Sequence, residues 1–236
     1  MAQKTIFLPD IGEVVIRKRK GAKSIRLSVS HDGQIRLSMP TWSPYAVGME
    51  FVRSKSEWLQ TQSHGKGHSI LKDGDRIGKA HRIVISEALK DKISTRVTET
   101  EIQINIPAHQ KPEDKEIQAC IRSAALKALK QEASKLLPQR LESLAAEHGF
   151  RYTSVSIKQL KARWGSCNSH KQIALSSYLM QLPWELIDYV LLHELVHTRI
   201  MAHGKPFWDE LSKYVSHLPR KRKIIRTHRP ALIPQA

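Results

Sequence analysis

Alternating apolar and polar positions dominate the first hundred residues and predict short β-strands. Residues 24–30 and 35–39 both alternate in this way, and Asp32-Gly33 between them is a dipeptide typical of hairpin turns. The other strands predicted in this region cover residues 13–19, 81–85, 93–97 and 102–106. These six strands predict an antiparallel sheet, and the pattern shows no internal repeat.

One helix is expected within this β-rich region, over residues 43–62. Its apolar side chains, among them Val47, Phe51 and Trp58, recur at helical intervals and would pack on the hairpin. The polar segment 63–68 contains two histidines and is interpreted as a surface linker.

The pattern becomes helical from Ile117 onwards, where apolar residues recur about 3.6 positions apart. Pro138 is expected to kink or split this segment, and Gly149 to cap its second part. Two strands and two helices are predicted after it, over residues 154–160, 172–176, 184–200 and 207–215.

The fold class expected is therefore α+β. The predicted parts are a β-rich region with one helix over residues 1–110, a core with both helices and strands over 111–218, and a basic tail over 219–236. With 40% hydrophobic and 26% charged residues the composition is that of a soluble globular protein, and no apolar run of 18 residues predicts a membrane span.

The expected compartment is the cytoplasm. The first residues carry no apolar stretch of the kind that marks a secretory signal. The two cysteines, Cys120 and Cys167, cannot build a disulfide framework, and free thiols fit a reducing compartment.

The charge balance is unusual. There are 39 Lys and Arg against 22 acidic residues, a net charge of +17, and runs of four basic residues at 17–20 and 220–223. Such a balance favours association with polyanions, so non-specific nucleic acid is an expected partner. Phosphate contacts carry affinity without base identity, so no sequence preference is implied.

His193-Glu194-x-x-His197 lies within the helix predicted over 184–200. Residues i and i+4 share one helix face, so both imidazoles can reach one metal ion. Glu194 stands beside that face, where a base for metal-activated water is needed. Apolar residues surround the motif, and unpaired imidazoles would be costly in such a core.

A catalytic zinc usually takes three protein ligands. His203 is the nearest downstream histidine, but on a continued helix it would point away, so the helix must end or bend before it. Gly204 and Pro206 are suitable helix breakers. The alternatives for a third ligand are His217, Glu210 and Asp209.

A third feature, residues 161–167, is a basic and aromatic turn between two predicted strands. Arg163 suits either a structural ion pair or a clamp for a substrate carboxylate. Cys167 is interpreted as a packing residue rather than a ligand or nucleophile.

Together these motifs resemble the YgjP-like metallopeptidase family, which is related to SprT-like and Wss-like zinc peptidases. The resemblance rests on Lys-Ala-Arg-Trp-Gly-Ser-Cys at 161–167, the strand from Ile173, residues 187–197 and His-Gly-Lys-Pro-Phe-Trp at 203–208. It implies a gluzincin-like core in which His193, His197 and His203 bind Zn2+ and Glu194 is the general base. Gly204 departs from the family pattern, where Ser commonly follows the third histidine.

The expected function is hydrolysis of peptide bonds in a protein or peptide substrate. Expected oxyanion donors are Tyr178, Arg163 and His217, and the expected edge for an extended substrate is near residues 173–176. One alternative is a nucleic-acid-associated basic protein with a structural or vestigial metal site. A related possibility is a protease that acts on DNA-bound proteins. Hydrolysis of a non-peptide amide is another.

Overall fold

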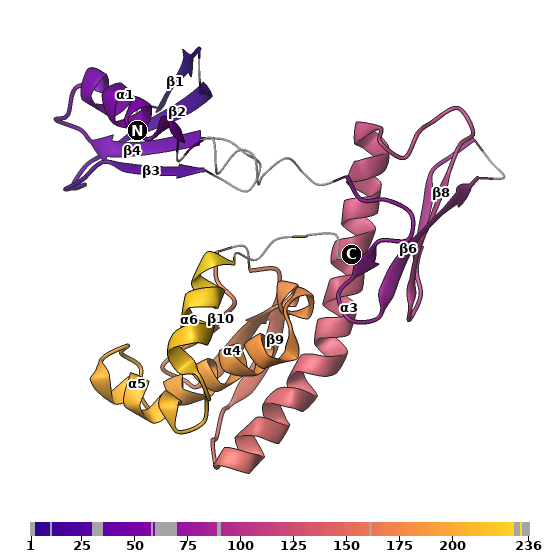
Figure 1. Ribbon diagram of the computed structural model, residues 1–236, viewed down its shortest axis with the longest axis vertical. Coiled ribbons are helices and arrows are strands. Elements are labelled where there is room, and N and C mark those ends of the chain that lie inside the picture. Colours follow the sequence, from indigo (N-terminus) through magenta and orange to yellow (C-terminus); the bar gives the residue numbers. More distant parts are fainter. Residues whose placement is uncertain are drawn as a thin grey trace. The chain divides into compact units, whose positions relative to one another are not determined.

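The chain folds into two compact units, Met1–Ser69 and Ile70–Ala236, each with its own apolar core (Figure 1). The computed structural model describes residues 3–9, 11–29, 35–57, 59, 70–88, 91–160, 162–228 and 232. The predicted hairpin turn, Trp58, the linker 63–68 and Lys161 lie outside the described residues. Within them, no helix combines the length and the apolar character needed to cross a bilayer.

The first unit is a four-stranded sheet with one helix. Its elements are β1 (Gln3–Leu8), β2 (Gly12–Arg19), β3 (Arg26–Val29), β4 (Ile35–Pro40) and α1 (Tyr45–Arg53). The strand order is β1-β2-β4-β3, with a parallel central pair and antiparallel outer pairs. Ile16 lies opposite Leu37 on the face that α1 covers, and both are buried. The strands predicted over 13–39 are confirmed, and the two that were predicted to form a hairpin pair antiparallel.

The second unit begins with a sheet of the same topology. Its strands are β5 (Arg76–Ile77), β6 (His81–Glu87), β7 (Ser94–Val97) and β8 (Glu101–Ile106), in the order β5-β6-β8-β7. The central pair is again parallel and the outer pairs antiparallel. A helix again comes next, α3 (Lys115–His148). The chain therefore contains a ββββα repeat, and the prediction of no internal repeat was wrong.

The six predicted strands do not form one antiparallel sheet either. Ile83, Ile102 and Ile104 of the second sheet are fully buried in one core with α3, whereas the strands of the first unit have a separate core. The compact units therefore divide at residue 69 and not at the predicted boundary of 110.

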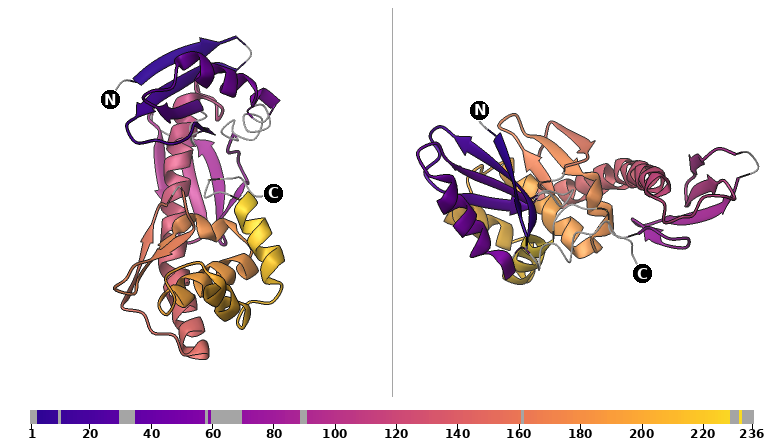
Figure 2. Two further views of the ribbon diagram at one scale, coloured as in Figure 1. Left: turned by 90° about the vertical axis from the view of Figure 1, so that its left-hand side faces the viewer. Right: turned by 90° about the horizontal axis from the view of Figure 1, so that it is seen from above.

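Helix α3 is the long axis of the second unit (Figure 2). It remains one helix through Pro138, so the predicted split is wrong. Leu137 and Leu141 on either side of the proline are fully buried. Gly149 ends it in the left-handed conformation with φ 67°, as predicted.

The remaining elements pack along the second half of α3 (Figure 1). They are β9 (Ser154–Lys158), β10 (Gly165–Cys167), β11 (Gln172–Ser176), the short 3-10 helix η1 (Ser177–Gln181), α4 (Trp184–His197), α5 (Lys205–Ser212) and α6 (Leu218–Thr227). The three strands form a sheet ordered β10-β11-β9. Helix α6 occupies much of the segment predicted to be a basic tail. The two cysteines are free.

Candidate metal centre

Helix α4 carries the first two histidines into the core. Pro183 precedes its first turn, and Leu191, Leu192, Leu195 and Val196 are all buried. The apolar positions fix the rotation of the helix. His193 and His197, four residues apart, consequently share one face.

The chain reverses directly after α4. Thr198 ends the helix, and α5 starts after Gly204 with Pro206 in its first turn, which confirms the predicted break. Arg199 holds this reversal in place, because its guanidinium donates to Glu210 Oε1 at 2.9 Å and to the Gly149 carbonyl at 2.7 Å. The reversal brings His203 back towards α4.

The three histidines converge on one point. The Nε2 atoms of His193, His197 and His203 lie 3.0–3.2 Å from one another. Nitrogens this close can all stand at the Zn–N distance of about 2.0–2.1 Å from a single ion. These residues are the one group of three His, Cys, Asp or Glu side chains within the described parts of the chain that is suited to holding a metal.

The protonation of the histidines suits a metal. Burial, with the positive charges of its neighbours, lowers the pKa of His193 to about 3, and burial also lowers that of His197. Nδ1 of His197 lies 3.1 Å from the Ile200 carbonyl. A proton on Nδ1 would donate there, which leaves the Nε2 lone pair directed at the ion. The residues present therefore fit a bound divalent cation.

Aromatic rings back the histidines. Phe207 is fully buried, and its ring centroid lies 4.5–4.8 Å from those of all three. Trp208 Nε1 donates to the His203 carbonyl at 3.0 Å. The sequence indicated a ligand and a helix break in the motif at 203–208, but the packing role of Phe207 and Trp208 was not predicted.

The side chain of Glu194 is buried and closely packed, next to His193 in the sequence of α4. It is 4% exposed, and its Oε2 has no hydrogen-bond partner among the described residues. Burial raises its pKa to about 8, partly opposed by the positive charge of Arg163. A cation held by the histidines would also oppose this shift, because an opposite charge favours the carboxylate.

Strand β10 forms one wall of the space around Glu194. A Cβ on Gly165 would lie 2.6 Å from Glu194 Oε1, so only glycine leaves room for the carboxylate. The sequence predicted a turn at 161–167, but Gly165–Cys167 is a strand paired with β11.

The predicted substrate edge near 173–176 is wrong, because β11 has a strand on each side. β10 is an edge strand of this sheet, and so is β9, which contacts α3. The Trp164 carbonyl accepts a hydrogen bond from the Ser176 N–H, and the Asn168 N–H donates to the Gln172 carbonyl, both in β11. In an antiparallel ladder the intervening Gly165 and Cys167 then direct their N–H and C=O groups outward.

The other candidate residues lie outside the metal group. Cys167 keeps its proton, because burial and Glu194 raise its pKa to about 11. Glu210 is bound by Lys213, Tyr214 and Arg199, and Asp209 by Lys205. The metal-binding group of three excludes all of these and also His217.

Among the expected oxyanion donors, Tyr178 is buried, and the charge of Arg163 acts on Glu194. Tyr189, which was not predicted, lies one turn before His193 with ring centroids 6.1 Å apart.

Residues 23–228 match the family model described as YgjP-like, metallopeptidase domain. The crystal structure of the metallopeptidase zymogen of Pyrococcus abyssi abylysin is 24% identical over 39% of this chain and 93% of its own, with a TM-score of 0.35. That of the Methanocaldococcus jannaschii jannalysin zymogen is 26% identical over 38% and 94%, with a TM-score of 0.34. No curated protein shows a significant match to the chain.

Proposed function

Because the chain belongs to the YgjP-like metallopeptidase family, we propose that it is a zinc-dependent peptidase with a gluzincin-like active site. His193, His197 and His203 are the ligands and Glu194 is the general base. One observation carries the proposal: three Nε2 atoms within 3.2 Å of one another stand beside a buried carboxylate.

Zinc is the metal that this donor set favours, since three imidazoles with an open position suit a tetrahedral catalytic site. When bound, zinc would lower the pKa of a coordinated water and polarise the carbonyl of the scissile bond. The three ligands come from α4 and the reversal after it, which Arg199 anchors to Gly149 at the end of α3.

Glu194 moves the proton. Its carboxylate accepts a proton from the attacking water and then delivers it to the nitrogen of the leaving amine. The narrow space against Gly165 holds the carboxylate in one place, and its burial excludes competing solvent. Arg163, whose charge already acts on Glu194, is the best placed of the expected donors to stabilise the oxyanion.

An extended peptide would bind as a further strand on β10. The outward backbone groups of Gly165 and Cys167 offer it two donors and two acceptors. This edge adjoins Glu194, so the scissile bond of a peptide paired there would lie beside the base.

Metal content and turnover together test the proposal. Purified protein should carry about one zinc per chain, as expected of a three-histidine site. The variant His193→Ala/His197→Ala should lose it, while His217→Asn keeps it. Glu194→Gln should keep zinc and lose peptide hydrolysis. Retained hydrolysis in Glu194→Gln, or full zinc content in the double variant, would refute the assignment of these residues.

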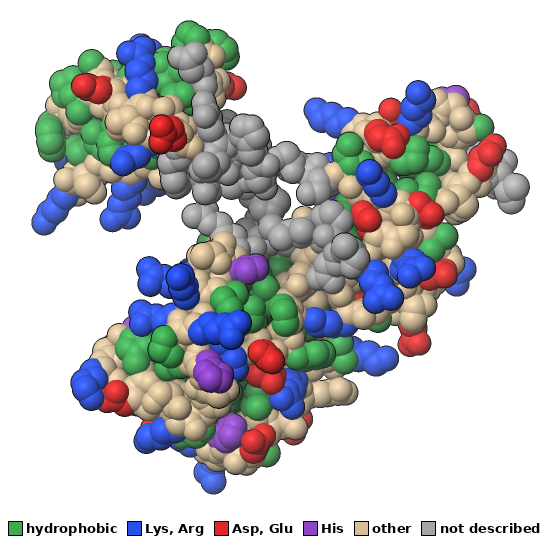
Figure 3. All heavy atoms as spheres, in the orientation of Figure 1, with side chains coloured by type: hydrophobic (Ala, Val, Ile, Leu, Met, Phe, Trp, Pro, Cys, Tyr) green, Lys and Arg blue, Asp and Glu red, His purple; other side chains and the backbone are tan. Residues whose placement is uncertain are grey.

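A second candidate function, association with nucleic acid, is favoured by the outer face of the first unit. Arg17 and Arg26 both lie opposite Ser38 on the sheet face away from α1, and Arg19 and Arg36 share that face by alternation. All four arginines are exposed. Figure 3 shows basic side chains projecting from the lower edge of this unit, where β3 runs in Figure 1.

Two of these arginines, Arg19 and Arg26, line a basic cavity. It measures about 450 Å³ and is lined by Arg19, Lys20, Lys23 and Arg26 among others. A phosphate backbone is the polyanion that such a row of cations fits. We therefore propose non-specific binding of nucleic acid on this face.

The salt dependence of DNA binding distinguishes binding at this face from attraction by the net charge of the protein. Lys20→Glu/Lys23→Glu should weaken binding of a DNA oligonucleotide and reduce the slope of log K against log salt by about 2. Arg53→Glu/Lys55→Glu makes the same charge change at the end of α1 and should leave the slope near that of the wild type. Equal effects of both pairs would mean that net charge alone attracts the oligonucleotide.

A further inference from the structure

Helix α6 places a row of positive charge beside the metal centre. It carries five basic residues and no acidic one. Leu218, Ile224 and Ile225 are partly buried and pack against the core that contains α4. His217, at φ 53°, makes the turn that directs the helix there. The apolar residues therefore fix the helix, and its basic residues remain at the surface.

One of these basic residues has a fixed position. The guanidinium carbon of Arg222 lies 3.8 Å from the centroid of the Trp208 ring. Trp208 in turn lies 5.7 Å from the His203 ring and 6.0 Å from the His193 ring, centroid to centroid. A planar guanidinium stacks well on an indole, and this contact holds the charge one ring away from two metal ligands.

No anion balances this charge within the described parts of the chain. Arg222 is exposed and forms no ion pair there. The carboxylates on α5 are already bound, Asp209 by Lys205 and Glu210 by Arg199 and Lys213.

The positive charge of Arg222 and a divalent metal at the histidines would repel each other, and an anion bound near both would relieve this repulsion. Both Arg222 and His203 are exposed, so that anion can arrive from solution. The stacking on Trp208 leaves the N–H edge of the guanidinium available for a bidentate bond to a carboxylate.

We propose that Arg222, held against Trp208, is a specificity-determining residue that binds a carboxylate of the peptide substrate close to the scissile bond. This inference rests on the proposed peptidase function. The carboxylate is either an acidic side chain or the carboxyl terminus of the peptide, and the experiment separates the two.

The test starts from one neutral reporter peptide that the wild type cleaves. Glu is placed at each position in turn, and the peptide is also made as free acid and as amide. For the wild type, one of these carboxylates should raise kcat/KM. Arg222→Ala should lower that preference about ten- to a hundred-fold, the effect expected for one charge-assisted bond. Arg222→Lys should retain part of it.

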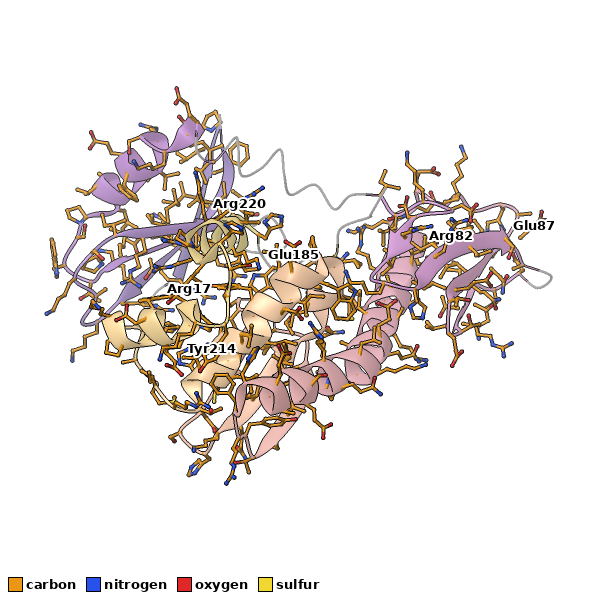
Figure 4. The ribbon with its side chains drawn as sticks, turned by 60° about the horizontal axis from the view of Figure 1, so that its bottom comes forward. Arg17, Arg82, Glu87, Glu185, Tyr214 and Arg220 are labelled. Atoms are coloured by element: carbon orange, nitrogen blue, oxygen red, sulfur yellow. The ribbon has the colours of Figure 1, made fainter. Side chains whose placement is uncertain are left out.

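Arg220→Ala is the matched control, because it removes the same charge from the same helix about 200° around the helix axis from Arg222. Figure 4 labels Arg220 on α6, together with Glu185 at the start of α4 and Tyr214 after α5. This variant should keep the preference of the wild type. An equal loss in both variants, or no preference in the wild type, would overturn the proposal.

A binding measurement separates this proposal from the peptidase function itself. Fluorescence anisotropy of labelled peptides with Glu194→Gln should show tighter binding of the favoured acidic peptide than of its neutral form, and Glu194→Gln/Arg222→Ala should abolish the difference. If no peptide is cleaved but this difference is seen, the peptidase function fails and the carboxylate site stands. If peptides are cleaved without any such difference, the carboxylate site fails alone.

Discussion

Gly165→Ala should disable Glu194, the proposed general base, without removing the metal. The added Cβ would lie 2.6 Å from Glu194 Oε1, 2.8 Å from its Cγ and 2.9 Å from its Cδ, whereas ordinary contact begins at 3.4 Å. One of the two partners must therefore move by about 0.8 Å. β10 is tied to β11, and Glu194 is 4% exposed on a helix packed in the core.

The size of the effect can be worked out from that displacement. A misplacement of about 1 Å in a catalytic group costs on the order of 10²-fold in rate. Crowding a packed site also costs about 1–3 kcal/mol of stability. A Cβ at this position would have no histidine ligand among its three nearest atoms. We therefore expect kcat/KM to fall by one to two orders of magnitude with zinc content unchanged.

The assay is kcat/KM on a reporter peptide, beside elemental analysis and thermal unfolding of the same samples. Gly204→Ala is the control, because its added Cβ would meet nothing closer than Pro206 Cδ at 3.5 Å. It should change kcat/KM only a few-fold. A folded, zinc-loaded Gly165→Ala protein with the activity of the wild type would refute the reasoning.

Two further predictions concern the buried pair His81–Glu132, whose Nδ1 and Oε1 are 2.6 Å apart. The bond to Glu132 raises the pKa of His81, while bonds from His81 and the backbone outweigh burial and lower the pKa of Glu132. The free energy of unfolding that Glu132→Gln loses, measured in urea, should therefore be greatest between about pH 4.5 and 6.5. The loss should shrink at lower pH, where Glu132 gains a proton, and at higher pH, where His81 loses one. A pH-independent loss would contradict this. Gly78→Ala should cost about 2–4 kcal/mol, because its Cβ would overlap Glu132 Oε2 at a φ of +70°, whereas Gly74→Ala meets only the φ penalty.

The convergence of the three histidines was predictable because the signal is local. His193 and His197 are one turn apart in a segment whose periodicity already indicates a helix. His203 required only the rule that a helix cannot bring residue i+6 to the same face, so a break had to come before it. The enclosure of Glu194 was not predictable in this way, because Gly165 approaches from a strand 29 positions earlier in the chain.

The sheets were harder to predict because alternation identifies strands but not their partners. β2 and β6 each pair in parallel with a strand two positions later, and nothing in a period of two distinguishes that from an antiparallel neighbour. The strand β10 has three residues, too few for a periodic signal. Helix α6 was predicted to be a tail because its segment is mostly basic, and only three partly buried apolar residues mark its packed face.

The two ββββα repeats differ in the length of their helices, and that difference determines where the three histidines and Glu194 lie. Helix α1 has 9 residues and covers one sheet, whereas α3 has 34 and continues past its sheet to η1 and α4. Glu132 on α3 accepts hydrogen bonds from the backbone of the β5–β6 turn at Lys79, Ala80 and His81. From that turn the Lys79 ammonium donates to the Leu182 carbonyl and lies over the Trp184 ring at the start of α4. The second repeat thus holds the amino-terminal end of the helix that carries His193, Glu194 and His197, so damage to the turn should reach the candidate metal centre.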